Sequence, residues 1–142
     1  MNVNDIMTHA VISVAQDEPV SAATRMLERY NIGSLPVTNS TGDIKGIVTD
    51  RDIALRCTAA RSDYGEVKIR DIMTRAVISV SPKDSVESAA RLMSREQVRR
   101  LPVTNGGKVV GMLSLCDMAR NREFDMEAAA TLTEISANVR KR

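Results

Sequence analysis

The stretch DIMTHAVISV, residues 5–14, returns as DIMTRAVISV at residues 71–80, and only His9 and Arg75 differ between the two copies. The motif LPVTN recurs with the same spacing, at residues 35–39 and 101–105. The repeat therefore covers most of the chain. Because two copies are too few for a solenoid, we expect two similar units that pack as a pseudo-two-fold pair and cover each other's apolar faces.

Composition narrows the class of protein. A chain of 142 residues with 43% hydrophobic and 27% charged residues is typical of a globular domain, and its net charge of +2 is only mildly basic. No segment has a continuous basic helix face, and no apolar run approaches the roughly 18 residues of a membrane span. The N-terminus also lacks the pattern of a signal peptide. We expect a cytoplasmic protein with no nucleic-acid or membrane partner.

Each copy predicts the element order β-α-β-β-α, so the fold class is mixed α/β (α+β). The β-branched run AVISV predicts a strand, the next segment has apolar residues at helical spacing, and LPVTN begins a hairpin. A second helix follows each hairpin. The ranges are strands at 10–14 and 76–80, helices at 17–30 and 83–96, hairpins at 35–49 and 101–114, and helices at 50–60 and 115–121. An alanine-rich tail, 124–142, predicts one more helix.

A shared motif closes both hairpins. GIVTDRD at 46–52 and GMLSLCD at 111–117 each carry a glycine, two apolar residues, a hydroxyl and an acid three residues after the hydroxyl. One interpretation is a capping box, in which Thr49 and Ser114 are helix N-caps that contribute about 1 kcal/mol each.

A second interpretation uses the same geometry for binding. A helix start offers unpaired backbone N–H groups to an anion, and an acid one turn into the helix accepts hydrogen bonds from the two hydroxyls of a ribose. Gly46 and Gly111 allow another backbone to approach closely. Capping alone requires neither the glycine nor repetition of the whole unit. Both interpretations remain open at this point.

Taken together, the IMT segments, the LPV strands and the doubled G-h-h-[ST]-x-x-D ending resemble a tandem CBS-domain pair, the Bateman module, in its small stand-alone prokaryotic form. The resemblance covers residues 5–121 and implies repeats at 1–62 and 71–122, a linker at 63–70 and a C-terminal helix at 123–142. It also implies a non-enzymatic regulatory module that binds AMP, ADP, ATP or another adenosyl compound in clefts between the repeats. No cofactor, metal site or catalytic residue is expected.

The resemblance also implies the residues of two clefts. The first cleft takes Thr8, Ile12, Ile32, Gly33, Ser34, Pro36, Arg99, Arg100, Ser114 and Asp117, and the second takes Thr49, Asp52, Thr74, Ile78, Val98 and Pro102. Arg99 and Arg100 would face a phosphate, since a guanidinium fork holds phosphate oxygens in fixed geometry. The second cleft lacks this pair, and Arg51 would replace it in part. The first cleft is therefore predicted to be the tighter site.

Family members commonly form homodimers through their helices, so the resemblance implies a homodimer and a regulated protein partner that the sequence does not identify. The alternative function is a structural or protein-interaction module with empty clefts. An enzyme is disfavoured because a lone histidine and scattered acids supply no set of nucleophile, base and orienting group.

Overall fold

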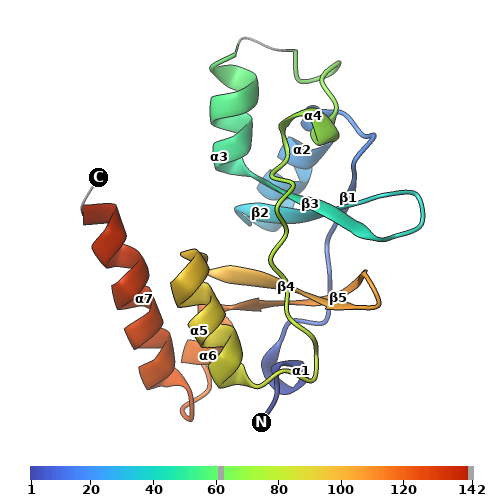
Figure 1. Ribbon diagram of the computed structural model, residues 1–142. Coiled ribbons are helices and arrows are strands. Elements are labelled where there is room, and N and C mark those ends of the chain that lie inside the picture. The colour runs from blue at the N-terminus through green and yellow to red at the C-terminus, as the bar shows by residue number, and fades with distance from the viewer. Residues whose placement is uncertain (61–62, 141–142) are drawn as a thin grey trace. The chain divides into compact units, whose positions relative to one another are not determined.

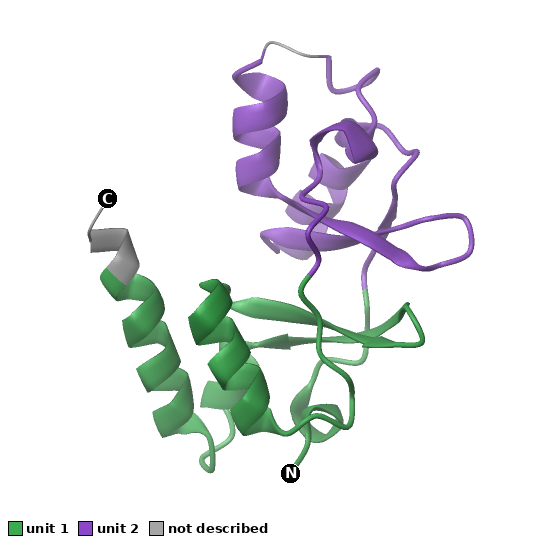
Figure 2. Cartoon of the chain, in the orientation of Figure 1, with its two compact units in different colours: residues 1–11, 78–142 green, residues 12–77 purple. Residues whose placement is uncertain are grey.

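The computed structural model describes residues 1–60 and 63–140, the last three of these by their backbone alone. The chain forms two units (Figure 2), and each unit has its own hydrophobic core. Unit 1 consists of residues 1–11 and 78–142, and unit 2 of residues 12–77. The domain boundaries predicted from the sequence repeat differ from this division into units, and they stay a prediction. Four residues of the predicted segments, Arg61, Ser62, Lys141 and Arg142, lie outside the described part of the chain.

Unit 2 contains a three-stranded sheet in the order β1-β2-β3, with β1 parallel and β3 antiparallel to β2 (Figure 1). Helix α2 precedes the β2–β3 hairpin, and a short helical segment follows it. The elements are β1 (Val14–Ala15), α2 (Val20–Tyr30), β2 (Ser34–Thr38), β3 (Ile44–Thr49), α3 (Asp50–Asp52), the π-helix η1 (Ile53–Thr58) and α4 (Ile69–Ile72).

Unit 1 repeats this plan with an antiparallel hairpin of β4 and β5 and adds a C-terminal helix. Its elements are α1 (Val3–Ile6), α5 (Val86–Glu96), β4 (Arg100–Asn105), β5 (Lys108–Ser114), α6 (Leu115–Ala119) and α7 (Asp125–Arg140). Helix α7 packs on α5 and α6, where Phe124, Ala128 and Ile135 join the unit 1 core. The predicted tail helix is thereby confirmed.

The two amphipathic helices and both hairpins form as the sequence predicts, except that α2 and α5 each begin three residues later than predicted. Val20 and Ala23 of α2, and their counterparts Val86 and Ala89 of α5, are fully buried. Tyr30, which continues the apolar spacing of α2, is instead 43% exposed. It is the last residue of the helix, because Asn31 turns into the left-handed conformation and ends α2 there.

The prediction of a strand over each AVISV run is largely wrong. In the first run only Val14 joins a strand, and in the second Val80 makes a single bridge to Val103. The units divide between residues 11 and 12 and between residues 77 and 78, within both runs. The β-branched residues therefore belong to the two connections between the units, where most of the backbone has no neighbouring strand.

Two local features were not predicted. The segment after β3 turns once as α3 and continues as the π-helix η1, in place of a regular α-helix over 50–60. The short helices α1 and α4 end on the isoleucine of the two IMT segments, where no helix was expected. Helices of four residues carry too few apolar positions to show a helical period.

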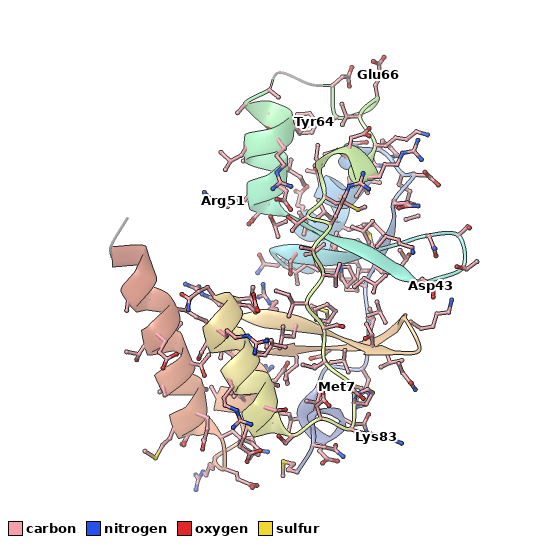
Figure 3. All side chains as sticks on the ribbon, viewed as in Figure 1. Met7, Asp43, Arg51, Tyr64, Glu66 and Lys83 are labelled. Carbon is pink, nitrogen blue, oxygen red and sulfur yellow. The ribbon has the colours of Figure 1, made fainter. Side chains whose placement is uncertain are left out.

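The segment after each short helix crosses to the hairpin of the other sequence copy. Thr8 exchanges backbone hydrogen bonds with Met112 (2.8 and 3.0 Å) in unit 1, and Thr74 does the same with Ile47 (2.9 and 2.8 Å) in unit 2. A Cβ at Gly111 would lie 2.9 Å from the Thr8 carbonyl oxygen and 2.6 Å from Sδ of Met7, the residue labelled in Figure 3. The motif glycine is thus required by a close approach of two backbones.

We predict that Gly111→Ala lowers the free energy of unfolding by about 1–3 kcal/mol, since a backbone carbonyl cannot yield as a flexible side chain can. Urea unfolding followed by circular dichroism measures this loss. The control is Gly65→Ala, because the nearest atom to a Cβ at Gly65 is a side-chain oxygen of Asp63 at 3.4 Å. Equal stability of the two variants would show that the close approach does not constrain unit 1.

The two cysteines differ in environment, and neither is in a disulfide. Burial raises the pKa of the Cys57 thiol, and the negative charge of Asp63 raises this pKa further. Cys116 is exposed on α6.

Because a raised pKa leaves less reactive thiolate, we predict that at pH 8 Ellman's reagent labels one thiol per native chain and reaches the second only in denaturant. Cys116→Ser should remove the fast reaction, and its persistence would contradict this assignment.

Candidate ribose-binding carboxylates

In unit 1 the turn from β5 into α6 is closed by a reciprocal pair of hydrogen bonds. The Asp117 backbone N–H donates to Ser114 Oγ (3.1 Å), and Asp117 Oδ2 accepts from the Ser114 backbone N–H (2.9 Å). The Ser114 hydroxyl also lies 3.0 Å from Oδ2. The capping box predicted from Ser114-x-x-Asp117 is therefore present, and it holds a buried carboxylate in one orientation.

The other carboxylate oxygen of Asp117 contacts two more residues. Thr8 Oγ1 donates to Oδ1 at 3.3 Å, and the guanidinium of Arg120 lies 2.7 Å from the same oxygen. Thr8 reaches this position because its backbone is paired with Met112 of β5. A carboxylate has about four acceptor positions. Ser114, Thr8 and Arg120 together occupy all four of them at Asp117.

Unit 2 builds the corresponding site around Asp52, which is also buried. Thr49 and Asp52 form the capping box, with both hydrogen bonds at 3.0 Å. Thr74 Oγ1 lies 3.4 Å from each oxygen of the carboxylate. Arg56 forms an ion pair with Oδ1 at 3.6 Å and donates to the carbonyl oxygens of Ile72 and Met73. Three predicted residues of the second cleft, Thr49, Asp52 and Thr74, therefore lie together.

The backbone N–H groups at these helix starts are largely satisfied within the protein, which corrects the expectation that they are open to an anion. The Leu115 N–H donates to the Arg99 carbonyl (3.1 Å), and the Asp50 N–H to the Gly33 carbonyl (3.1 Å). The Arg51 N–H donates to the side chain of Asp50. The first N–H group of each helix is therefore engaged by a backbone carbonyl of the protein.

The predicted phosphate-binding arginines are exposed. Arg100 lies opposite Ser114 in the β4–β5 register, and Arg99 precedes it. Within the described part of the chain, neither guanidinium group forms a hydrogen bond or an ion pair. Arg51, proposed as a partial replacement, is exposed at the start of α3 (Figure 3). Their role in binding a phosphate stays a prediction.

The units divide the predicted cleft residues between them. Unit 1 holds Thr8, Arg99, Arg100, Ser114 and Asp117 of the first cleft, with Ile78, Val98 and Pro102 of the second. Unit 2 holds Ile12, Ile32, Gly33, Ser34 and Pro36 of the first cleft, with Thr49, Asp52 and Thr74 of the second. The assembly of each full set into one cleft stays a prediction.

Sequence reasoning missed the arginines beside the two carboxylates. Arg120 follows Asp117 by three residues and Arg56 follows Asp52 by four, spacings that place the side chains on one face of a helix. This signal was readable in the sequence. A shallow cavity of about 410 Å³, wide open to solvent, is lined by Ile6, Asp117, Arg120, Asn121 and Arg122.

The described residues contain neither a metal-binding cluster nor a membrane-spanning helix. No group of three or more histidine, cysteine, aspartate or glutamate side chains is arranged to hold a metal ion there. None of the described helices is both long enough and apolar enough to cross a membrane.

Comparisons with known proteins agree with the geometry. A family model of the CBS domain matches residues 3–57 and again residues 69–123. The CBS domain-containing protein YhcV of Bacillus subtilis is 37% identical over 135 residues, which cover 95% of each chain. The two IMT segments and both S/T-x-x-D motifs lie inside the matched ranges.

Solved structures show the same fold. Hypoxic Response Protein I, crystallised with two coordinated zinc ions, has a TM-score of 0.79 and 29% identity, covering 85% of this chain and 98% of its own. The CBS domain pair of protein MJ0100, in complex with 5'-methylthioadenosine and S-adenosyl-L-methionine, has a TM-score of 0.75 and 30% identity, covering 84% and 94%. These matches confirm the resemblance seen in the sequence: the chain belongs to the CBS domain family and carries two CBS domains.

Proposed function

We propose that this protein is a non-enzymatic regulatory module that binds an adenosyl compound through Asp117 of unit 1 and Asp52 of unit 2. The observation that carries the proposal is the environment of Asp117. A buried carboxylate, held by Ser114 and contacted by the Thr8 hydroxyl, lies at a shallow, open cavity of about 410 Å³. A fixed carboxylate is suited to accept hydrogen bonds from the vicinal hydroxyls of a ribose.

The ligand class follows from the shared chemistry of the candidates. The related CBS pair of MJ0100 was crystallised with two adenosyl compounds, 5'-methylthioadenosine and S-adenosyl-L-methionine. AMP, ADP and ATP carry the same adenosine, and two aspartates that recognise ribose do not distinguish among these molecules. The exposed Arg99 and Arg100 favour a ligand with phosphates at unit 1.

Regulation completes the proposal. Binding would couple to a second protein through a change in stability or conformation, typically with about 1–3 kcal/mol of coupling free energy. We propose that the module acts in the cytoplasm as a homodimer and that a protein partner senses its ligand state. Catalysis is no part of the proposal, because the buried acids are engaged as helix caps and the histidine, His9, is exposed.

A second candidate function is a protein-interaction module that binds no small molecule. The observation that favours it is the complete set of partners around Asp117, whose acceptor positions are all occupied by the protein itself. On this alternative the two S/T-x-x-D motifs serve as helix caps alone.

Thermal unfolding with AMP, ADP, ATP and S-adenosylmethionine, each at millimolar concentration, separates the two functions. A ligand at 100 times its dissociation constant adds about 2.7 kcal/mol to the free energy of unfolding. For a chain of this size we expect Tm to rise by roughly 5–10 °C. The double variant Asp52→Ala/Asp117→Ala should lose this rise, because both ribose acceptors are removed.

The matched control is Asp5→Ala/Asp71→Ala. Asp5 and Asp71 also accept a backbone N–H from the residue three positions earlier, at the starts of α1 and α4, but both are exposed. Both double variants should lose some stability without ligand, and only the control should keep the ligand-dependent rise. Absence of a rise in the unmodified protein, or its persistence in Asp52→Ala/Asp117→Ala, would favour the interaction module.

A further inference from the structure

The open cavity beside Asp117 is lined by more positive than negative charge. Two arginines, Arg120 and Arg122, line it together with Asp117, Asn121 and Ile6 of α1. The side chain of Arg120 is 73% exposed, whereas that of Asp117 is 7% exposed. The carboxylate is thus fixed, and the arginine that contacts it is free to adopt other rotamers.

Arg120 occupies an acceptor position that a ribose needs. Oδ2 of Asp117 is used by the Ser114 backbone and hydroxyl, and Oδ1 by Thr8 and Arg120. The capping bonds cannot be released without opening the start of α6. A ribose hydroxyl therefore gains access to Oδ1 most easily by displacing Arg120, the exposed partner of that oxygen.

Unit 2 differs at this position. The residue that corresponds to Arg120, with Asp52 aligned to Asp117, is Leu55, which is 54% exposed. Arg56 lies 3.6 Å from Asp52 and is anchored by the Ile72 and Met73 carbonyls. Arg56 is therefore held by the backbone, whereas the Arg120 guanidinium, among the described residues, bonds to Asp117 alone.

We propose that Arg120 is a latch and a specificity residue for the unit 1 site. Without ligand it closes on Asp117. When a ribose takes Oδ1, Arg120 turns to the anionic group of the same ligand and, with Arg122 on the same cavity, pairs with its phosphate. Unit 1 then selects a phosphorylated adenine nucleotide over a neutral adenosyl compound. This inference rests on the proposed function of Asp117 as a ribose acceptor.

The chemistry accounts for the preference. A displaced guanidinium beside a neutral ligand loses its ion pair and gains only contacts with water. Beside a phosphate it gains a charge-assisted, bidentate partner of higher charge than one carboxylate. The cost of opening the latch is thus offset only for an anionic ligand.

Isothermal titration calorimetry with AMP and with adenosine tests the proposal, in an Asp52→Ala background that leaves Asp117 as the ribose-binding acid. We expect Arg120→Leu, which installs the residue found in unit 2, to weaken AMP binding about tenfold or more, the usual effect of losing a hydrogen bond to a charged group. Adenosine binding should stay unchanged or tighten by up to about fivefold, since an exposed ion pair is released. Arg120→Lys should retain part of the AMP preference.

Three comparisons distinguish the possible failures. Arg95→Leu removes a cation of α5 that does not line the cavity, and it should leave both affinities unchanged. Equal changes for AMP and adenosine in Arg120→Leu, or no change in either, would overturn the role of Arg120 while Asp117 remains the ribose acceptor. Binding that is absent in the starting protein, or insensitive to Asp117→Ala, would instead overturn the proposed function itself.

If Arg120→Leu does not fold, Arg120→Lys and Arg122→Leu test the same preference, because each should reduce the ratio of AMP to adenosine affinity.

Discussion

The close approach of two backbones at Gly46 and at Gly111 is the constraint on which the rest of this structure depends. A side chain at Gly111 would meet the Thr8 carbonyl, and one at Gly46 would meet the Thr74 carbonyl. Because both positions lack a Cβ, the segment after each short helix pairs with a hairpin strand from the other sequence copy. The same pairing delivers a threonine hydroxyl to each buried aspartate. One steric requirement thus shapes both the fold and the candidate site.

The two interpretations of the S/T-x-x-D motif are compatible, because the two oxygens of each carboxylate have different surroundings. At Asp117, Oδ2 belongs to the helix cap and Oδ1 lies toward Thr8 and Arg120. The cap contributes about 1 kcal/mol to stability whether or not a ligand is present. It also fixes the carboxylate, so that a ligand meets an acceptor that is already oriented. A structural role therefore supports a binding role here.

Local patterns predicted the elements that depend on local interactions. The spacing of Val20 and Ala23 indicated α2, the turn residues between LPV and the motif glycine indicated the hairpins, and the hydroxyl–acid spacing indicated both capping boxes. Thr8 and Asp117 lie 109 residues apart in sequence, and no periodicity reports such a contact. The strands predicted over the AVISV runs were largely wrong because β-branched residues favour an extended backbone whether or not a partner strand exists. The positions of Arg56 and Arg120 beside the two aspartates could have been predicted from their helical spacing.

A crystal structure of the protein grown with AMP tests most directly whether Asp117 is a ribose acceptor within an intact helix cap. The account predicts a ribose hydroxyl on Oδ1 of Asp117, with Oδ2 still bonded to Ser114 and Arg120 turned from the carboxylate to the phosphate. A nucleotide bound away from Asp117, with Arg120 still on Oδ1, would contradict it.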